Sequence, residues 1–317
     1  MASTAGTVTA PRPNRRTWAV AAAALIGSIG VVAAGAGAPA RRASQVRHGD
    51  PGVRSRAALV LDESQDKPLF AKHPEEVAPI ASITKLMTAM VVLDAGQALD
   101  ETIEVDRADV DVRKHTHSRL PVGARLARGE LLRIALMASE NRAAAALGRT
   151  YPGGVEECVL AMNRKAAEIG MTRSRFADTS GLSSGNVSSA EDLSRMVLAA
   201  AKYPAIREAT TTAEHEVTLA DGRVIAFRNS NGLVRRKDWT IGLSKTGYIH
   251  EAGRCLVMQA EIAARQVVIV LLDSWGRYTR LGDANRIRRW IEATLPAPGT
   301  ATGEIHRAAP ASASGRR

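Results

Sequence analysis

Apolar residues recur along this chain with two different periods, and the period predicts the element. Spacings of three and four residues predict amphipathic helices, whereas alternation or short continuous apolar runs predict strands. The predicted helices are 82–93, 128–147 with a polar break at 139–141, 155–169, 190–202 and 287–295. The predicted strands are 57–61, 69–72, 102–105, a hairpin within 214–227, 242–249, 254–262 and 266–272. These elements make residues 57–295 the expected folded domain, and no internal repeat divides it.

The segments outside this domain differ from it in composition. Residues 1–40 have the organisation of a signal peptide: a basic start, an uncharged Ala/Gly-rich run over 18–38, and a small-residue cleavage signal at Ala38-Pro39-Ala40. The run is long enough for an uncleaved membrane anchor, but its many glycines and alanines make it weakly hydrophobic, which favours cleavage. We therefore expect an exported protein, periplasmic or otherwise extracytoplasmic. Residues 41–56 are polar and basic and predict a linker, while residues 296–317 predict a disordered tail.

Composition and charge narrow the class of protein. Of 317 residues, 45% are hydrophobic and 24% charged, which is typical of a chain with a packed core. Aromatic residues make up 3%, too few to favour a module that stacks single-stranded nucleic-acid bases. The net charge of +11 suits an anionic partner such as an acidic cell-wall polymer, and +8 would remain without residues 1–40. The basic residues are scattered rather than clustered, so we expect no nucleic-acid partner.

One apolar stretch, residues 77–93, carries the first chemical signal. It contains a single charged residue, Lys85, and Ser82 precedes it by three positions, so a helix starting near Ser82 makes the two neighbours. Burial in an apolar helix lowers the pKa of a lysine. A neutral amine one turn from a hydroxyl can take its proton, which produces a serine nucleophile without histidine. The alternative interpretation is a helix-capping serine with a lysine that reaches out to water.

Two other candidate sites are weaker. Cys158 and Cys255 lack the spacing of a zinc site, and each is best interpreted as a small buried apolar residue, although a disulfide between them stays open. His115 and His117 lie in a polar stretch without a third ligand at suitable spacing, which predicts a solvated loop. We expect neither a metal nor an organic cofactor.

Two further motifs follow the Ser82-x-x-Lys85 pair in the chain. The polar triplet Ser139-Glu140-Asn141 interrupts an apolar helical segment, as expected of a turn between two helices. Lys245-Thr246-Gly247 lies within a predicted strand. Each motif is weak alone, but the order of the three on helix, turn and strand is a strong combined signal.

The combination resembles the penicillin-binding proteins and serine β-lactamases. It is most similar to the low-molecular-mass D-alanyl-D-alanine peptidases, in particular the endopeptidases of the penicillin-binding protein 7 type. The stretches that carry the resemblance are 81–95, 137–154, 176–186 and 245–260. The resemblance implies an α+β fold of the β-lactamase/transpeptidase type, in which a central antiparallel sheet is flanked by helices. A mainly helical lobe over about 80–205 would face the sheet across the active cleft.

The resemblance also implies catalytic roles. Ser82 would attack the carbonyl of the penultimate D-residue and become the acyl ester. Lys85 would be its general base, and Ser139 would relay a proton to the leaving amine.

The remaining site residues would bind substrate. Asn141 would hydrogen-bond the substrate amide, and Lys245 would hold the substrate carboxylate and support the motif serine. Thr246 would add a hydroxyl contact, and Gly247 would let the strand approach closely. The backbone N–H of Tyr248, with that of the nucleophile, would form the oxyanion hole.

These roles predict a peptidoglycan DD-endopeptidase or carboxypeptidase that binds stem peptides and is inhibited by β-lactam antibiotics. A class A β-lactamase needs a loop glutamate after the second motif, whereas Glu156, Glu157 and Glu168 fall in a predicted helix. A short tail after Leu295 leaves no room for the extra domain of many carboxypeptidases, which favours the endopeptidase. The alternatives are a serine β-lactamase, an inactive wall-binding module and an interaction protein anchored by residues 18–38.

Overall fold

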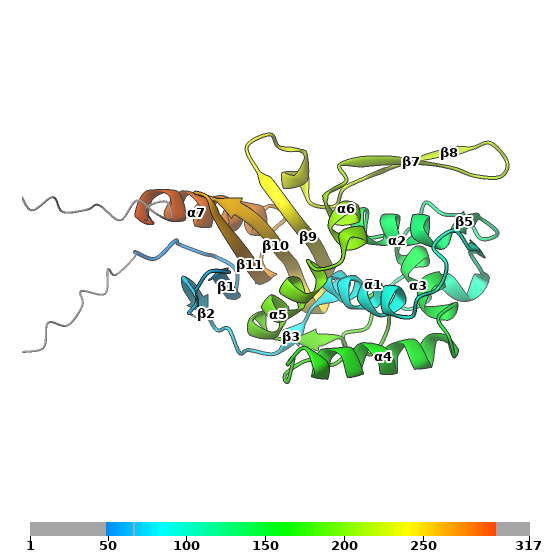
Figure 1. Ribbon diagram of the computed structural model, residues 1–317, viewed down its shortest axis with the longest axis horizontal. Coiled ribbons are helices and arrows are strands. Elements are labelled where there is room, and N and C mark those ends of the chain that lie inside the picture. Colours follow the sequence, from blue (N-terminus) through cyan, green and yellow to red (C-terminus); the bar gives the residue numbers. More distant parts are fainter. Residues whose placement is uncertain (1–48, 66, 296–317) are drawn as a thin grey trace, which may run out of the picture. The chain divides into compact units, whose positions relative to one another are not determined.

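The two ends of the folded chain build one antiparallel sheet of five strands, visible in Figure 1. The strands are β1 (Ala57–Asp62), β2 (Phe70–Lys72), β9 (Thr240–Ile249), β10 (Gly253–Ile262) and β11 (Arg265–Ser274). Across the sheet they lie in the order β2-β1-β11-β10-β9. The structure, a computed structural model, describes residues 49–65 and 67–295. The predicted signal peptide, residues 41–48 of the predicted linker and the predicted tail lie outside the described residues.

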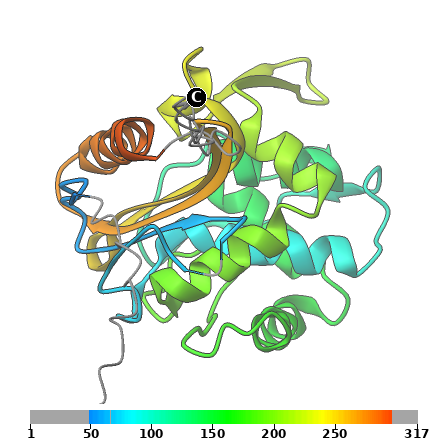
Figure 2. The same ribbon diagram turned by 60° about the vertical axis from the view of Figure 1, so that its left-hand side comes forward.

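Helices cover both faces of this sheet, as Figure 2 shows. The last helix, α7 (Thr279–Thr294), packs on one face, where Ile287 and Ile291 join a core cluster with sheet residues. Helix α5 (Ala190–Ala200) packs on the other face, against β1, β10 and β11. Because both faces are covered, the run from Val267 to Leu272 is buried throughout, which explains its continuous apolar sequence. The predicted central antiparallel sheet flanked by helices is confirmed.

Helix α7 begins at Thr279, well before the predicted start at residue 287. Its first turns are mostly polar, so the apolar period that marks a helix is missing there. The buried Asp283 holds these polar turns against the rest of the fold. Its carboxylate accepts hydrogen bonds from the backbone N–H groups of Arg54 and Ser55 and from the Ser55 hydroxyl. Residues 53–56, predicted as the end of a linker, therefore belong to the fold.

The remaining helices form a lobe beside the sheet around the central helix α1. Its members are α1 (Thr84–Asp94), α2 (Arg128–Met137), α3 (Asn141–Arg149), α4 (Gly154–Glu168) and α6 (Pro204–Thr211). Nine of the eleven residues of α1 are buried, because helices pack around it on several sides. The predicted helical lobe is confirmed, including the break between α2 and α3.

Helix α6 was not predicted from the sequence. Pro204 marks the end of the preceding helix, but it also occupies the first turn of α6, where a missing N–H costs nothing. The same residue can thus end one helix and begin the next. Helix α6 matters for the site, since it packs against α2 and β9.

Short elements connect the sheet and the lobe. Three two-stranded pairs are formed by β3 (Ala78–Pro79) with β6 (Val187–Ser188), β4 (Thr102–Glu104) with β5 (Arg125–Ala127), and β7 (Glu214–Thr218) with β8 (Val224–Arg228). Four 3-10 turns are η1 (Ala81–Ile83), η2 (Arg107–Asp109), η3 (Gly232–Arg235) and η4 (His250–Ala252). The β7–β8 hairpin projects over the lobe in Figure 1 and turns at Asp221-Gly222 as predicted, with Gly222 at a φ of +81°.

The two cysteines are unpaired and buried, Cys158 on α4 and Cys255 on β10. Both belong to the main apolar core, so the interpretation as small buried residues is confirmed and the disulfide is not formed. Among the described residues, no helix has both the length and the apolar character needed to cross a bilayer.

Candidate active site

Ser82 lies in η1, directly before α1, at the point where the lobe meets the sheet. The Lys85 ammonium is one helical turn away and donates to the Ser82 hydroxyl oxygen over 2.9 Å. The preceding residue, Ala81, has a φ of +48°, a left-handed conformation that is costly for a residue with a Cβ. The predicted pairing of serine and lysine is confirmed, and the backbone is strained where the serine is presented.

Lys85 is 1% exposed, and its amine has three acceptors within hydrogen-bond distance. Besides Ser82, these are the side-chain oxygen of Asn141 at 2.7 Å and the backbone carbonyl of Ser180 at 2.5 Å. Burial lowers the pKa of Lys85 to about 8, although the nearby carboxylates of Asp178 and Glu140 act in the opposite direction. A large fraction of this amine is therefore neutral just above neutral pH, as a general base requires.

The Ser139-Glu140-Asn141 triplet forms the turn between α2 and α3, as predicted. Ser139 adopts a φ of +62°, which again places a strained residue at the site. The Asn141 amide nitrogen donates to the Thr116 hydroxyl over 2.9 Å, while its oxygen accepts from Lys85. Asn141 is thereby fixed in orientation before any substrate arrives.

The Lys245-Thr246-Gly247 motif lies on β9, the edge strand of the sheet next to η1. A Cβ at Gly247 would lie 2.8 Å from the Ile80 carbonyl oxygen and 3.2 Å from the Ser82 nitrogen. The glycine therefore allows the strand to lie against the backbone that presents the nucleophile.

Lys245 is buried, and its amine donates to the Thr246 carbonyl over 3.1 Å. Burial, together with the charges of Lys85 and Arg280, lowers its pKa well below the usual value. Lys245 directly precedes Thr246, which lines the cleft, and its expected contact with a substrate carboxylate stays a prediction.

The three motifs converge on one open cleft of about 210 Å³. It is lined by Ser82, Thr116, Ser139, Asn141, Leu182, Thr246, Gly247, Tyr248 and Arg280. Tyr248 is 55% exposed at its edge. Six of the eight residues singled out from the sequence line this cleft, and the other two, Lys85 and Lys245, hydrogen-bond to residues that do.

Comparison with known proteins identifies the family of this chain. The model of the D-alanyl-D-alanine carboxypeptidase family matches residues 44–275. The chain belongs to this family. It is 43% identical over 267 residues to the D-alanyl-D-alanine endopeptidase of Escherichia coli, covering 83% of this chain and 86% of that protein. It is 45% identical over 241 residues to the D-alanyl-D-alanine endopeptidase of Pseudomonas aeruginosa, covering 76% and 78%.

Solved structures of the family share the fold. A Streptomyces DD-transpeptidase superposes with a TM-score of 0.71 at 25% identity, covering 77% of this chain and 99% of that one. A D-alanyl-D-alanine carboxypeptidase from Mycobacterium tuberculosis gives 0.71 at 26% identity, covering 80% and 96%. The predicted β-lactamase/transpeptidase-like α+β fold is confirmed, and the chain is a serine-type D-alanyl-D-alanine peptidase. Glu156, Glu157 and Glu168 all lie on α4, as predicted, which agrees with a peptidase rather than a class A β-lactamase.

Sequence reasoning did not single out Arg280, which enters the cleft from the first turn of α7. Its side chain is partly buried, and its Nε has no hydrogen-bond partner among the described residues. Burial and the charge of Arg254 lower its pKa. Nothing in the local sequence distinguishes it from the other arginines of a strongly basic segment. Its position beside Thr246 and Tyr248 makes it the cation that a substrate anion entering the cleft would meet.

Sequence reasoning also missed how loop 178–186 supports Lys85. The Asp178 carboxylate accepts from the backbone N–H groups of Ser180, Gly181 and Ser183, at 2.9, 2.5 and 2.6 Å. These bonds hold the loop so that the Ser180 carbonyl faces the lysine amine. The richness of this stretch in Gly, Ser and Asn was the available signal, but it indicates only a loop.

His115 and His117 lie exposed in a loop before β5, as predicted. Within residues 49–65 and 67–295, no three His, Cys, Asp or Glu side chains gather as a metal ion would require.

Proposed function

We propose that this protein cuts peptidoglycan cross-links as a DD-endopeptidase, and uncross-linked stems as a DD-carboxypeptidase, through an acyl-enzyme on Ser82. The single observation that carries this proposal is the hydrogen bond from the buried Lys85 amine to the Ser82 hydroxyl. The names of two curated relatives, both D-alanyl-D-alanine endopeptidases, support the endopeptidase reaction.

Lys85 acts as the general base in its neutral form. A neutral amine has two N–H groups and one lone pair. The oxygens of Asn141 and Ser180 accept the two N–H groups, and the lone pair is then directed at Ser82. This geometry lets the amine take the hydroxyl proton while the oxygen attacks the D-alanyl carbonyl carbon.

Charge that develops on the carbonyl oxygen is stabilised by the backbone N–H groups of Ser82 and Tyr248. The substrate carboxylate next to the scissile bond binds Arg280 and the Thr246 hydroxyl, which line the same cleft. Lys245, whose amine donates to the Thr246 carbonyl, supports this part of the site from a buried position.

Bond changes then follow in two steps. In acylation, the bond from Ser82 Oγ to the carbonyl carbon forms and the amide C–N bond breaks. The proton taken by Lys85 is returned, through the Ser139 hydroxyl, to the leaving amine. In deacylation, water attacks the ester, regenerates the serine and releases the shortened stem peptide.

An intact-mass time course with benzylpenicillin tests the nucleophile. We expect a long-lived covalent adduct on the wild-type protein and none on the S82A variant. Purified cross-linked muropeptide then serves as substrate, with product masses showing cleavage between the two stems. Rapid turnover of penicillin without a lasting adduct would instead favour a β-lactamase, and a wild-type protein without any adduct would overturn the assignment.

We further propose that the protein acts outside the cytoplasm, with residues 1–40 as its export signal, and that β-lactams inhibit it. The basic sequence start and uncharged run of this segment support export. Fractionation of cells expressing the full chain, followed by mass measurement of the recovered protein, tests both export and cleavage after Ala40.

A further inference from the structure

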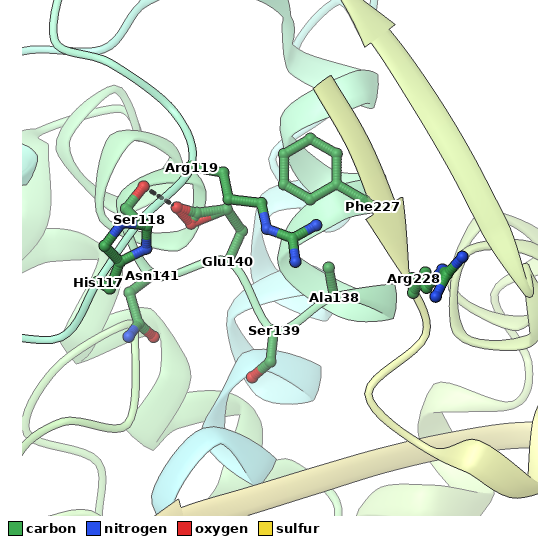
Figure 3. Close-up of a pocket in the computed structure, with 9 residues that line it drawn as sticks. All are labelled: His117, Ser118, Arg119, Ala138, Ser139, Glu140, Asn141, Phe227 and Arg228. Carbon is green, nitrogen blue, oxygen red and sulfur yellow. Dashed lines mark hydrogen bonds between the residues drawn. The ribbon is translucent and has the colours of Figure 1, made fainter. Parts of the chain in front are cut away.

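A second cavity, of about 310 Å³, opens directly beside the catalytic cleft. Its lining side chains, drawn in Figure 3, are His117, Ser118, Arg119, Ala138, Ser139, Glu140, Asn141, Phe227 and Arg228. They come from the loop before β5, from the turn between α2 and α3, and from hairpin strand β8. Ser139 and Asn141 line both this cavity and the cleft that contains Ser82, so the two spaces adjoin at these residues.

The position of Ser139 indicates which part of the substrate this cavity faces. In the proposed mechanism Ser139 delivers the proton to the leaving amine, so the group that departs lies on the Ser139 side of the scissile bond. A carboxypeptidase releases a single alanine there, which is much smaller than this cavity. An endopeptidase releases an amine that is attached to a whole second stem peptide.

The charges of the lining side chains indicate the kind of ligand. The Arg119 guanidinium lies among the lining side chains, Arg228 lines the rim of the cavity, and His117 is exposed beside them. The one acid in the lining, Glu140, is buried and already bonded to the Ser118 hydroxyl, as the dashed line in Figure 3 marks. Guanidinium groups pair with carboxylates in a fixed planar geometry. The cavity therefore favours an anionic ligand.

The structure holds Arg119 in place from two sides. Its backbone belongs to the loop that supplies Thr116 to the catalytic cleft, and its guanidinium donates to the Ala226 carbonyl of β8 over 2.5 Å. Phe227 is buried next to that carbonyl and supplies an apolar surface to the cavity. Arg228 reaches the rim, with its Nε 3.2 Å from Glu214 and most of its side chain exposed. The β7–β8 hairpin thus provides one wall of the cavity.

We propose that this cavity binds the second stem peptide of a cross-link, the anionic peptide that leaves when Ser82 is acylated, through Arg119 and Arg228. This inference rests on the proposed function and specifies its substrate: the cavity distinguishes a cross-linked stem from a free one. A carboxylate of the leaving stem pairs with the guanidinium groups, while its chain lies along Phe227.

The test compares three substrates for one double variant, R119A with R228A. For the cross-linked muropeptide we expect kcat/KM to fall about tenfold, the effect of losing one charge-assisted hydrogen bond, mostly through a higher KM. Release of D-alanine from a monomeric pentapeptide and acylation by benzylpenicillin should change less than about twofold, because neither ligand extends into the cavity. The matched control is R223A, near the turn of the same hairpin and outside the cavity, which should leave all three rates unchanged.

Two results would overturn the inference: cleavage of the cross-linked substrate at the wild-type rate, or an equal fall for all three substrates, which would indicate a structural role. A paired R119K and R228K variant should recover part of the lost kcat/KM because it restores the charge. An error in the proposed function would give a different result: the wild-type protein itself would form no penicillin adduct or would leave the cross-link uncut.

A second substrate isolates the charge. Amidation of the leaving stem's carboxylates, except the one next to the scissile bond that Arg280 binds, should reduce wild-type kcat/KM to the level of the double variant, and should leave the double variant unaffected. Equal rates of the wild-type protein on both substrates would contradict recognition through a carboxylate.

Discussion

At the residue scale, the site depends on one buried amine with three acceptors. Lys85 draws those acceptors from the turn η1 before its own helix, from the α2–α3 turn and from loop 178–186. Because the amine is 1% exposed, water does not compete for its lone pair once it is neutral. Its protonation state therefore controls when Ser82 can act.

The rate of acylation should rise with pH through the titration of Lys85. Burial lowers its pKa to about 8, so the protonated, inactive form dominates below that pH and the neutral base dominates above it. The second-order rate constant for benzylpenicillin acylation, measured between pH 6 and 9.5, should increase with a midpoint near 8. A rate independent of pH over this range would contradict a lysine base.

The buried carboxyl of Glu140 should set part of that midpoint. Its charge raises the pKa of Lys85, while burial raises the pKa of Glu140 itself. In an E140Q variant the acidic limb of the acylation profile should move to lower pH, because the lysine loses a partner that favours its charged form. The glutamine can still accept from Ser118, so S118A serves as a control for the hydrogen bond alone. A midpoint that stays in place would show that Glu140 does not influence the base.

At the element scale, the nucleophile is held between two segments of backbone that approach it closely. Strand β9 approaches through Gly247, and loop 178–186 approaches through Gly181, where an added Cβ would lie 2.1 Å from the Ala81 carbonyl oxygen. Ala81 itself has a positive φ, so the strained turn is held from both sides. Helix, strand and loop thus position Ser82 jointly.

A G181A variant should lose acylation without losing the fold. The new Cβ would push the loop away from Ala81, and the Ser180 carbonyl would move off Lys85, so we expect the benzylpenicillin rate constant to fall by about 100-fold or more. The matched control is G96A: Gly96 also has a positive φ, at +65°, but open space surrounds its Cβ position. Both variants bear the conformational cost of about 1 kcal/mol, and only G181A bears the clash. Equal rates for the two variants would refute this account of the loop.

At the scale of the whole molecule, the fold depends on contacts between its ends. Strand β1 pairs with β11 along six residues, and the buried Asp283 of α7 binds the segment before β1. These contacts join segments more than 200 residues apart. They complete the sheet whose edge strand, β9, carries one wall of the cleft.

Removal of the Asp283 carboxylate should destabilise the whole domain. A D283A variant leaves the Ser55 N–H and hydroxyl without their buried acceptor, which we expect to lower the free energy of unfolding by about 2–4 kcal/mol. Urea denaturation measures this change. The control is D221A, an exposed carboxylate at the hairpin turn, where we expect less than about 0.5 kcal/mol. Since Asp283 is not part of the cleft, the D283A protein that remains folded should still be acylated by benzylpenicillin.

The sequence by itself determined most elements and the identity of the site. The spacing of apolar residues distinguishes a helix from a strand, and it depends only on neighbours a few residues away. For this reason α1, the α2–α3 break and the β10–β11 hairpin were predictable. The adjacency of Ser82 and Lys85 is equally local, because it follows from helical geometry. The resemblance of the three ordered motifs to a known family identified the residues of the other walls of the cleft, but it gave no distance between them.

Tertiary structure alone decided what surrounds those residues. The Ser180 carbonyl reaches Lys85 across 95 positions of sequence, and Arg280 enters the cleft from α7 beside β9, which no local period encodes. Lys245 is buried because neighbouring elements cover its side chain. Such contacts depend on how distant elements pack, and packing is a property of the whole core rather than of any short segment.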